Sequence, residues 1–447
     1  MRRTRQRPNA LQWLAVLVLL VRTDGSSSIP SFSSPPNTRS SWHHHRATTR
    51  TSHPRGCHRA RIATSTAAAR SSPLRFLGPY PTLPLRFPNL STSSQRARGV
   101  SGVSLDWVLD TAANVNTINA VVAKELELEK VGVVPGGVGA GGDMTGGDTF
   151  LLGNCFLEDY PSSSSGGMAA GGDAVGMGSV GDTTTTDDVD DINDNGCFMK
   201  GLTASALPVA SPAAAGLLGL AFFYCFENGV EFRWGGRSTD DDDNDNDGGM
   251  LPPSVTFYGQ DDIPNYDGLV RVSFESLPVS MLPSVRLVIN GKEIPALFDT
   301  GSPITVLNSR AAMEAGIDTV VRYSKINETE EGGEGSWNPF SKFASNVQMA
   351  REIAMATSRG DILTIAGSGG MPVRLVKSKS MANVDIMASS GSSTPLSSAR
   401  VYVGDLPGLA ALGGLGGDAP PAAVLGMDLL CTRQRVVFRA RQNEIYL

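Results

Sequence analysis

Apolar residues recur along the chain in short runs, and several runs occur twice in the same order. One kind directly precedes an Asp-Thr turn and a helix-like stretch, a second ends in glycine, and a third follows that glycine. A short apolar run bounded by a turn signal predicts a buried strand. The paired runs are 107–109 and 296–298, 217–219 and 424–426, and 230–233 and 436–439.

The clearest repeat aligns residues 110–128 with residues 299–317 without a gap. Internal repetition of this kind indicates duplicated structural units. We therefore predict two homologous lobes, the first over 104–236 and the second over 265–447. Identical residues coincide at Asp110/Asp299, Thr111/Thr300, Asn119/Asn308, Ala123/Ala312 and Glu125/Glu314.

Two low-complexity segments interrupt this pattern. Residues 161–196 are mostly Ser, Gly, Thr and Asp, and residues 240–247 contain only Asp and Asn. Such segments lack the apolar side chains that a packed core requires. We expect a disordered insertion over 161–196 in the first lobe and an acidic linker over 237–264 between the lobes.

The first 103 residues have the composition of a targeting leader. Arginines precede an 11-residue apolar run at 11–21, shorter than the roughly 20 residues that span a bilayer, which fits a signal peptide, or a signal anchor, over 1–24. Residues 25–103 contain no Asp or Glu, and their Arg- and Ser-rich composition predicts a disordered transit peptide or pro-segment. A signal peptide followed by a transit peptide resembles the bipartite leaders of plastid proteins. We expect a plastid location, with the secretory pathway or vacuole as the alternative, and membrane contact only through an uncleaved leader.

Charge and histidine are distributed unevenly. Residues 1–103 contain 16 arginines and one acidic residue, whereas residues 104–447 carry 43 acidic and 22 basic residues. An acidic body is a poor partner for nucleic acid. All five histidines precede residue 59, so the body has no Ser-His-Asp triad, Cys-His dyad or histidine metal ligand. We expect no cofactor and no metal.

The body cysteines show no zinc-site spacing. Cys155, Cys197, Cys225 and Cys431 contain no C-x-x-C pair and are typical of buried thiols. A bridge between Cys155 and Cys197, across the first-lobe insertion, is a further possibility in an oxidising compartment.

The duplicated Asp-Thr turn suggests a chemistry that needs no histidine. If two homologous lobes pack about a pseudo-two-fold axis, Asp110 and Asp299 meet on that axis. Two adjacent carboxylates cannot both ionise, so they share a proton and titrate as a pair. One can accept a proton from a water molecule while the other polarises a peptide carbonyl. The small residues that follow each aspartate, Ala112-Ala113 and Gly301-Ser302, allow the sharp turn.

These residues resemble the pepsin and retropepsin aspartic proteases. The segment 299–302 (Asp-Thr-Gly-Ser) is that family's motif in full, and 285–299 resembles the hairpin that leads to it, with Asn290-Gly291 as the tight turn. The resemblance implies an all-β fold with short helices, in which two pseudo-two-fold-related β-barrel lobes enclose the active site. It also implies a monomer, because the pseudo-dimer is intramolecular.

The resemblance assigns a role to each site residue. Asp110 and Asp299 would be the catalytic pair, supported by the residues of the two turns. Thr111 and Thr300 would hydrogen-bond across the lobes, Gly301 would lend a backbone N–H, and each of two glycines would let a strand pass behind an aspartate loop. Glycine-rich flaps would lie at 131–152 and near 361–371. The supporting residues are Thr111, Thr300, Ala112, Gly301, Ala113, Ser302, Gly219 and Gly426.

The first lobe departs from the family pattern. Ala112 occupies a position where glycine is usual, Asn114 is unexpected, and the first flap contains no tyrosine. The main hypothesis is an endopeptidase that hydrolyses peptides or unfolded proteins. The alternative is a weak or inactive peptide-binding module on the same fold.

Overall fold

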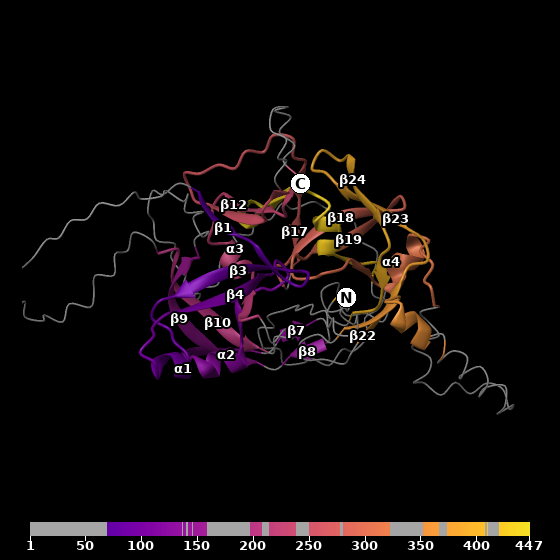
Figure 1. Cartoon of the computed structure of the whole chain (residues 1–447). Helices are drawn as coiled ribbons and strands as arrows, with labels where there is room; N and C mark the ends of the chain where they lie inside the picture. Colours follow the sequence, from indigo (N-terminus) through magenta and orange to yellow (C-terminus); the bar gives the residue numbers. More distant parts are fainter. Residues whose placement is uncertain are drawn as a thin grey trace, which may run out of the picture.

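The computed structural model describes most of the chain from residue 69 to the C-terminus. It contains two β-rich lobes that lie side by side, joined by a third sheet (Figure 1). No helix in the described part of the chain is long and apolar enough to cross a membrane. The described residues are 69–135, 137–139, 142–144, 146–158, 197–207, 214–237, 250–277, 280–321, 351, 353–365, 373–406, 409 and 420–447.

The first lobe is a closed β-barrel. Its strands follow the order β3-β4-β11-β5-β10-β9, and pairing between β3 and β9 closes the ring. Strands β2 and β6 extend the sheet at either end, and short helices α1, α2 and α3 connect it. The bounds are β2 Arg75–Leu77, β3 Tyr80–Phe87, α1 Ser93–Arg96, β4 Val103–Leu109, β5 Thr117–Asn119, α2 Ala120–Glu125, β6 Glu129–Val134, β7 Gly137–Gly139, β8 Gly142–Met144, β9 Gly147–Leu157, β10 Met199–Leu207, β11 Gly216–Leu218 and α3 Leu220–Phe223.

The second lobe is built on one large sheet. Its strands follow the order β21-β22-β25-β20-β26-β19-β18-β23-β24, and β17 pairs with β18. The turn between β18 and β19 is Asn290-Gly291, with positive φ at both residues, so the predicted tight turn is confirmed. The bounds are β17 Glu275–Ser276, β18 Pro283–Ile289, β19 Lys292–Phe298, β20 Val306–Leu307, α4 Ser309–Glu314, β21 Ile362–Ile365, β22 Val373–Lys377, β23 Ala382–Met387, β24 Ser393–Ala399, β25 Tyr402–Val403, β26 Ala423–Leu425 and α8 Met427–Leu430.

The two lobes repeat one topology. In the first, β11 is parallel to β4 and antiparallel to β5, and β5 is parallel to β10. In the second, β26 is parallel to β19 and antiparallel to β20, and β20 is parallel to β25. The predicted all-β, bilobal acid-protease fold is confirmed. Closure into a barrel is seen in the first lobe, whereas the described strands of the second lobe form an open path.

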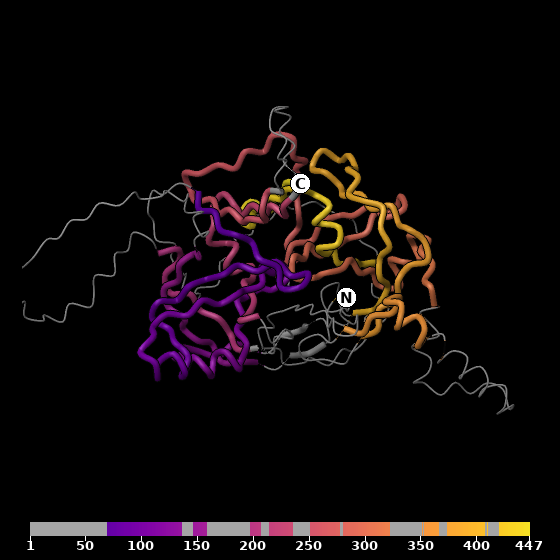
Figure 2. The backbone as a smooth tube through the Cα atoms, viewed as in Figure 1, coloured from indigo at the N-terminus to yellow at the C-terminus, as the bar shows by residue number. Residues whose placement is uncertain are grey.

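A six-stranded sheet joins the lobes. Strand β12 of the first lobe pairs directly with β27 of the second, and these strands are the predicted final strands of the two repeats. The smooth trace in Figure 2 shows this sheet above the junction between the lobes. In sheet order the strands are β1 Arg70–Pro73, β15 Ser254–Tyr258, β12 Gly229–Arg233, β27 Arg435–Arg439, β28 Glu444–Tyr446 and β16 Arg271–Ser273.

The core is continuous between the lobes. The ring of Phe438 on β27 stacks on Phe298 at 5.6 Å and on Phe274 at 5.5 Å between centroids, and it meets Phe223 edge-on at 5.4 Å. Phe298 directly precedes Asp299, so this aromatic cluster fixes the strand that carries the second aspartate. Such ring pairs contribute about 0.5–1.5 kcal/mol each beyond the area that they bury.

Two predicted boundaries are wrong. The segment 25–103 is not disordered throughout, because it contains β1, which begins at Arg70, and the strands β2 and β3 that follow. The side chains of Leu83, Leu85 and Phe87 on β3 are fully buried. The segment 237–264 is not only a linker, because β15 lies between β1 and β12. The leader before residue 69 and the insertion at 161–196 lie outside the described residues.

Candidate active site

The two aspartates lie at the ends of two equivalent strands, β4 and β19. Asp110 follows β4 and Asp299 follows β19, and both residues are almost completely buried, with 2% and 1% of their surface exposed. Apolar residues end both strands, which draws the aspartate backbone into the core. The backbone N–H of Asp110 donates to Leu218 O at 3.0 Å, and that of Asp299 donates to Leu425 O at 3.1 Å. The aspartates are therefore held in equivalent ways by β11 and β26.

The two carboxyl groups lie close enough for each to shift the pKa of the other. The main chain of Gly301 also lies against Asp110, since a Cβ added to this glycine would lie 2.6 and 2.7 Å from the two carboxylate oxygens of Asp110. The structure thus brings together the two residues that the sequence predicted to meet. Two buried carboxyl groups this close to each other cannot both be ionised, so the pair keeps a proton.

Backbone N–H groups of the turns orient the carboxylates. Ala112 N–H donates to Asp110 Oδ1 at 2.8 Å, and Gly301 N–H donates to Asp299 Oδ1 at 2.8 Å. The N–H groups of Ala113 and Ser302 also act on the carboxyl of the aspartate of their own turn. The two residues that follow the threonine in each turn therefore contact the pair through the main chain.

The two threonines cross the boundary between the lobes, as the resemblance implies. Thr111 N–H donates to Thr300 Oγ1, and Thr300 N–H donates to Thr111 Oγ1, each at 3.1 Å. The Thr111 hydroxyl in turn donates to Phe298 O at 2.8 Å, and the Thr300 hydroxyl donates to Leu109 O at 2.7 Å. These four bonds tie the end of β4 to the end of β19.

Gly219 and Gly426 lie where a side chain has no room. A Cβ on Gly219 would lie 2.5 Å from Ala113 O and 2.6 Å from Val115 O, and a Cβ on Gly426 would lie 2.5 Å from the carbonyl carbon of Ile304. Both obstacles are backbone atoms of an aspartate loop. The strand behind each loop therefore approaches closely because its residue is glycine, as predicted.

Burial controls the proton affinity of the pair. Removal from water raises the pKa of Asp110 from 3.8 to about 7, and the N–H of Ala112 partly opposes this rise. Burial is also the largest cause that raises the pKa of Asp299 well above its ordinary value, and the negative charge of Asp110 raises it further. Both effects favour a pair that keeps at least one proton.

Asn116 and Thr305 also support the loops, and we did not predict them. Each lies six residues after its aspartate, and each side-chain oxygen accepts the N–H of the glycine behind the loop at 3.1 Å. The gapless alignment already places these residues at equivalent positions. Asn116 carries an amide and Thr305 carries a hydroxyl, so a comparison of residue types between the two repeats did not indicate that they share a role.

Hairpins lie at the two predicted flap positions. Strands β6 and β9 pair antiparallel around the first, and β21 and β22 pair antiparallel around the second. Residues 366–372, which complete the second predicted flap, lie outside the described residues.

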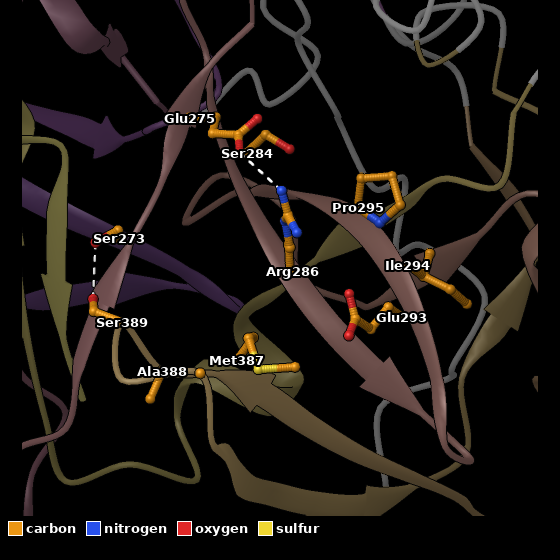
Figure 3. Close-up of a pocket in the computed structure, with 11 residues that line it drawn as sticks. Ser273, Glu275, Ser284, Arg286, Glu293, Ile294, Pro295, Met387, Ala388 and Ser389 are labelled. Atoms are coloured by element: carbon orange, nitrogen blue, oxygen red, sulfur yellow. Dashed lines mark hydrogen bonds and ion pairs between the residues drawn. The ribbon is translucent and has the colours of Figure 1, made fainter.

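A separate cleft of about 540 Å³ lies on the second lobe (Figure 3). Arg286 and Glu275 form an ion pair of 3.1 Å on its wall, and the side chains remain 61% and 79% exposed. None of the predicted site residues lines this cleft.

Among the described residues, no group of three His, Cys, Asp or Glu side chains is placed to hold a metal ion. Cys155 and Cys197 are buried thiols rather than a disulfide, and burial strongly raises the pKa of Cys155.

Comparison with known proteins supports the same reading. The family model described as "Aspartyl protease" matches residues 285–338, which include β18, β19 and Asp299. The resemblance to the pepsin and retropepsin aspartic proteases is confirmed. The aspartyl-protease match covers only the first part of the second lobe, and the first lobe repeats the topology of the second, as described above.

Solved structures are similar to this chain only at low sequence identity, and no curated protein matches it. The chain is similar to conglutin gamma, a basic 7S globulin from lupine seeds, at 10% identity and a TM-score of 0.37, with 85% of this chain and 94% of that chain covered. It is also similar to basic 7S globulin from soybean, at 11% identity and a TM-score of 0.33, with 82% and 93% covered.

Proposed function

We propose that this protein is an aspartic endopeptidase that hydrolyses peptide bonds in peptides or unfolded proteins. The observation that carries the proposal is the buried pair of Asp110 and Asp299, in which each carboxyl shifts the pKa of the other and both are held by equivalent contacts from two lobes. This arrangement provides a general base and a general acid without histidine, cysteine or metal.

The mechanism follows from the shared proton. The ionised carboxylate accepts a proton from a water molecule, and the resulting hydroxide adds to the carbonyl carbon of the scissile bond. The protonated carboxyl donates its proton to the carbonyl oxygen, which gives a neutral gem-diol. The carboxyl that took the proton from water then donates it to the amide nitrogen, while the other carboxylate accepts a hydroxyl proton from the gem-diol. The C–N bond breaks to give a carboxylic acid and an amine, and the pair again holds one proton.

A second candidate function, peptide binding without turnover, is favoured by Ala112. The methyl group of this residue replaces the glycine that the second lobe has at Gly301, where a Cβ would meet a carboxylate. This methyl group breaks the pseudo-symmetry of the two turns at the position next to the aspartate pair. The fold would then remain while turnover is lost.

Cleavage of a denatured protein between pH 4 and 8 separates these two functions. We expect the wild-type chain to produce fragments, and we expect D110N and D299N each to abolish them. A peptide with a secondary alcohol in place of the scissile carbonyl should inhibit the wild type, because it mimics the gem-diol. Binding of this analogue without cleavage at any pH would favour the second candidate, and cleavage that survives both substitutions would refute the first.

We also propose a plastid location, with the secretory pathway or vacuole as the alternative. The raised pKa values of the pair support work near neutral pH rather than in strong acid. Mass spectrometry of the N-terminus of the protein isolated from its cells tests this proposal, because a bipartite leader predicts two successive cleavages.

A further inference from the structure

We propose that Asp428 is a positioning residue that fixes the Asp299 turn through Thr305. Its effect on turnover rests on the proposed endopeptidase function, but its effect on the structure does not. Asp428 is the second residue of α8, and Thr305 lies in the loop that follows Asp299.

The Thr305 hydroxyl forms a bridge between two segments. It donates to Asp428 Oδ1 at 2.7 Å and accepts the backbone N–H of Gly426 at 3.1 Å. A hydroxyl that donates to a carboxylate becomes a stronger acceptor, because hydrogen bonds in a chain polarise one another. The Asp428 carboxylate therefore strengthens the bond that holds Gly426 behind the loop.

The segment held in this way contacts both ends of the Asp299 turn. Leu425 O accepts the N–H of Asp299 at 3.1 Å, and Met427 N–H donates to Ser302 O at 2.8 Å. Gly426 lies between these two anchors and packs against the backbone of Ile304. If the Gly426 backbone moves, the hydrogen bonds of Leu425 and Met427 to the Asp299 turn therefore change as well.

In the first lobe, the glycine behind the aspartate loop is held by an uncharged side chain. There Asn116 Oδ1 accepts the N–H of Gly219, and Asn116 Nδ2 donates to Thr203 O on β10 at 3.2 Å. The position equivalent to Asp428 is Ala221. An anionic anchor is therefore specific to the lobe that carries Asp299.

Asp428 also has a local role, because its Oδ1 accepts the N–H of Leu429 at 2.9 Å. If it served only the four-residue helix α8, its removal would affect that helix and leave Asp299 unchanged. The two roles can be separated because Thr305 belongs to the positioning path and not to the helix.

The experiment compares four variants of the full chain: D428A and T305V, which break the path, and D428N and T305S, which keep an acceptor and a hydroxyl. Asp261, an exposed residue on the loop between β15 and β16, provides the D261A control. Hydrogen exchange is measured at the amides of Asp299 and Gly426, with Asp110 and Gly219 as internal references. Steady-state kinetics on a cleaved peptide give kcat and KM.

We expect D428A and T305V to accelerate exchange at Asp299 about tenfold or more, to leave Asp110 unchanged, and to lower kcat about tenfold with KM constant. The D428A/T305V double variant should be no worse than either single variant, because both changes break one path. D428N, which keeps an acceptor but loses the charge, and T305S, which keeps the hydroxyl, should fall between wild type and D428A, and D261A should stay within about twofold of wild type.

Unchanged exchange at Asp299 in D428A, or additive effects in the double variant, would overturn the proposal. Accelerated exchange at Asp299 in a protein that cleaves no peptide would support the positioning role and refute the proposed function.

Discussion

Thr111 and Thr300 exchange hydrogen bonds across the lobe boundary, and each backbone N–H donates to the hydroxyl of the other residue over 3.1 Å. Both residues are fully buried, so each bond is made away from water. Two lobes that came from one repeat are thus joined at the point where their aspartates meet.

Replacement of either threonine by valine should destabilise the protein and slow the reaction. T300V leaves the buried N–H of Thr111 without an acceptor, which costs about 1–3 kcal/mol of unfolding free energy. T300S, which keeps the hydroxyl, is the control and should retain most of the stability. Denaturant unfolding of T111V, T300V and the double variant gives the coupling energy, and strictly additive losses would contradict a shared network.

Substitutions at the two glycine-equivalent positions should have opposite outcomes. G301A places a methyl group within 2.7 Å of both carboxylate oxygens of Asp110, so we expect a loss of about 100-fold in kcat. A112G removes a methyl group and restores the symmetry of the two turns, so we expect activity equal to or above wild type. Full activity in G301A would show that the crowded geometry around Asp110 is incorrect.

Stability should fall as pH rises through the neutral range. The folded pair has raised pKa values, so between pH 4 and about 7 the folded state holds protons that the unfolded chain has released. The unfolding free energy contributed by the pair is fully present below pH 4 and is lost as pH rises, by at most about 1.4 kcal/mol per pH unit for each proton.

The D110N/D299N variant isolates this contribution, because neither amide titrates. Its unfolding free energy should decline less steeply than that of the wild type between pH 4 and 7. Parallel stability curves for the two proteins would contradict the raised pKa values.

Removal of the N-terminal strands should unfold the first lobe. A chain that begins at residue 69 keeps β1 to β3, and we expect it to show cooperative thermal unfolding by circular dichroism. A chain that begins at residue 104 loses the buried side chains of Leu83, Leu85 and Phe87, each of which contributes about 1.5–3 kcal/mol by burial. Equal melting temperatures for the two chains would contradict the role of β3 in closing the barrel.

The duplicated turns and the glycines behind them were predictable because they are local signals placed at fixed spacing. The aspartates, threonines and glycines appear twice in the same order, and the tight turn at Asn290-Gly291 has its own signature. One repeat therefore predicted both the topology and the contacts of the pair.

The first barrel strands were missed because composition masked their pattern. Leu83, Leu85 and Phe87 lie in a strand that is buried at every residue except Arg86, but the surrounding segment lacks acidic residues and resembles a leader. Strand β15 was missed because it lies shortly after the acidic run at 240–247. Pairing of β15 with β1 and β12 is a long-range event that neither segment signals by itself.

The proton content of the Asp110–Asp299 pair tests the central claim most directly. Potentiometric titration of the wild type against D110N/D299N measures the difference in bound protons between pH 4 and 9. A pair with raised pKa values predicts that the wild type still holds at least one extra proton at pH 5.5, where ordinary carboxyl groups are ionised. Identical proton content at pH 5.5 and above would show that the two carboxyl groups ionise independently, and it would contradict the shared-proton mechanism.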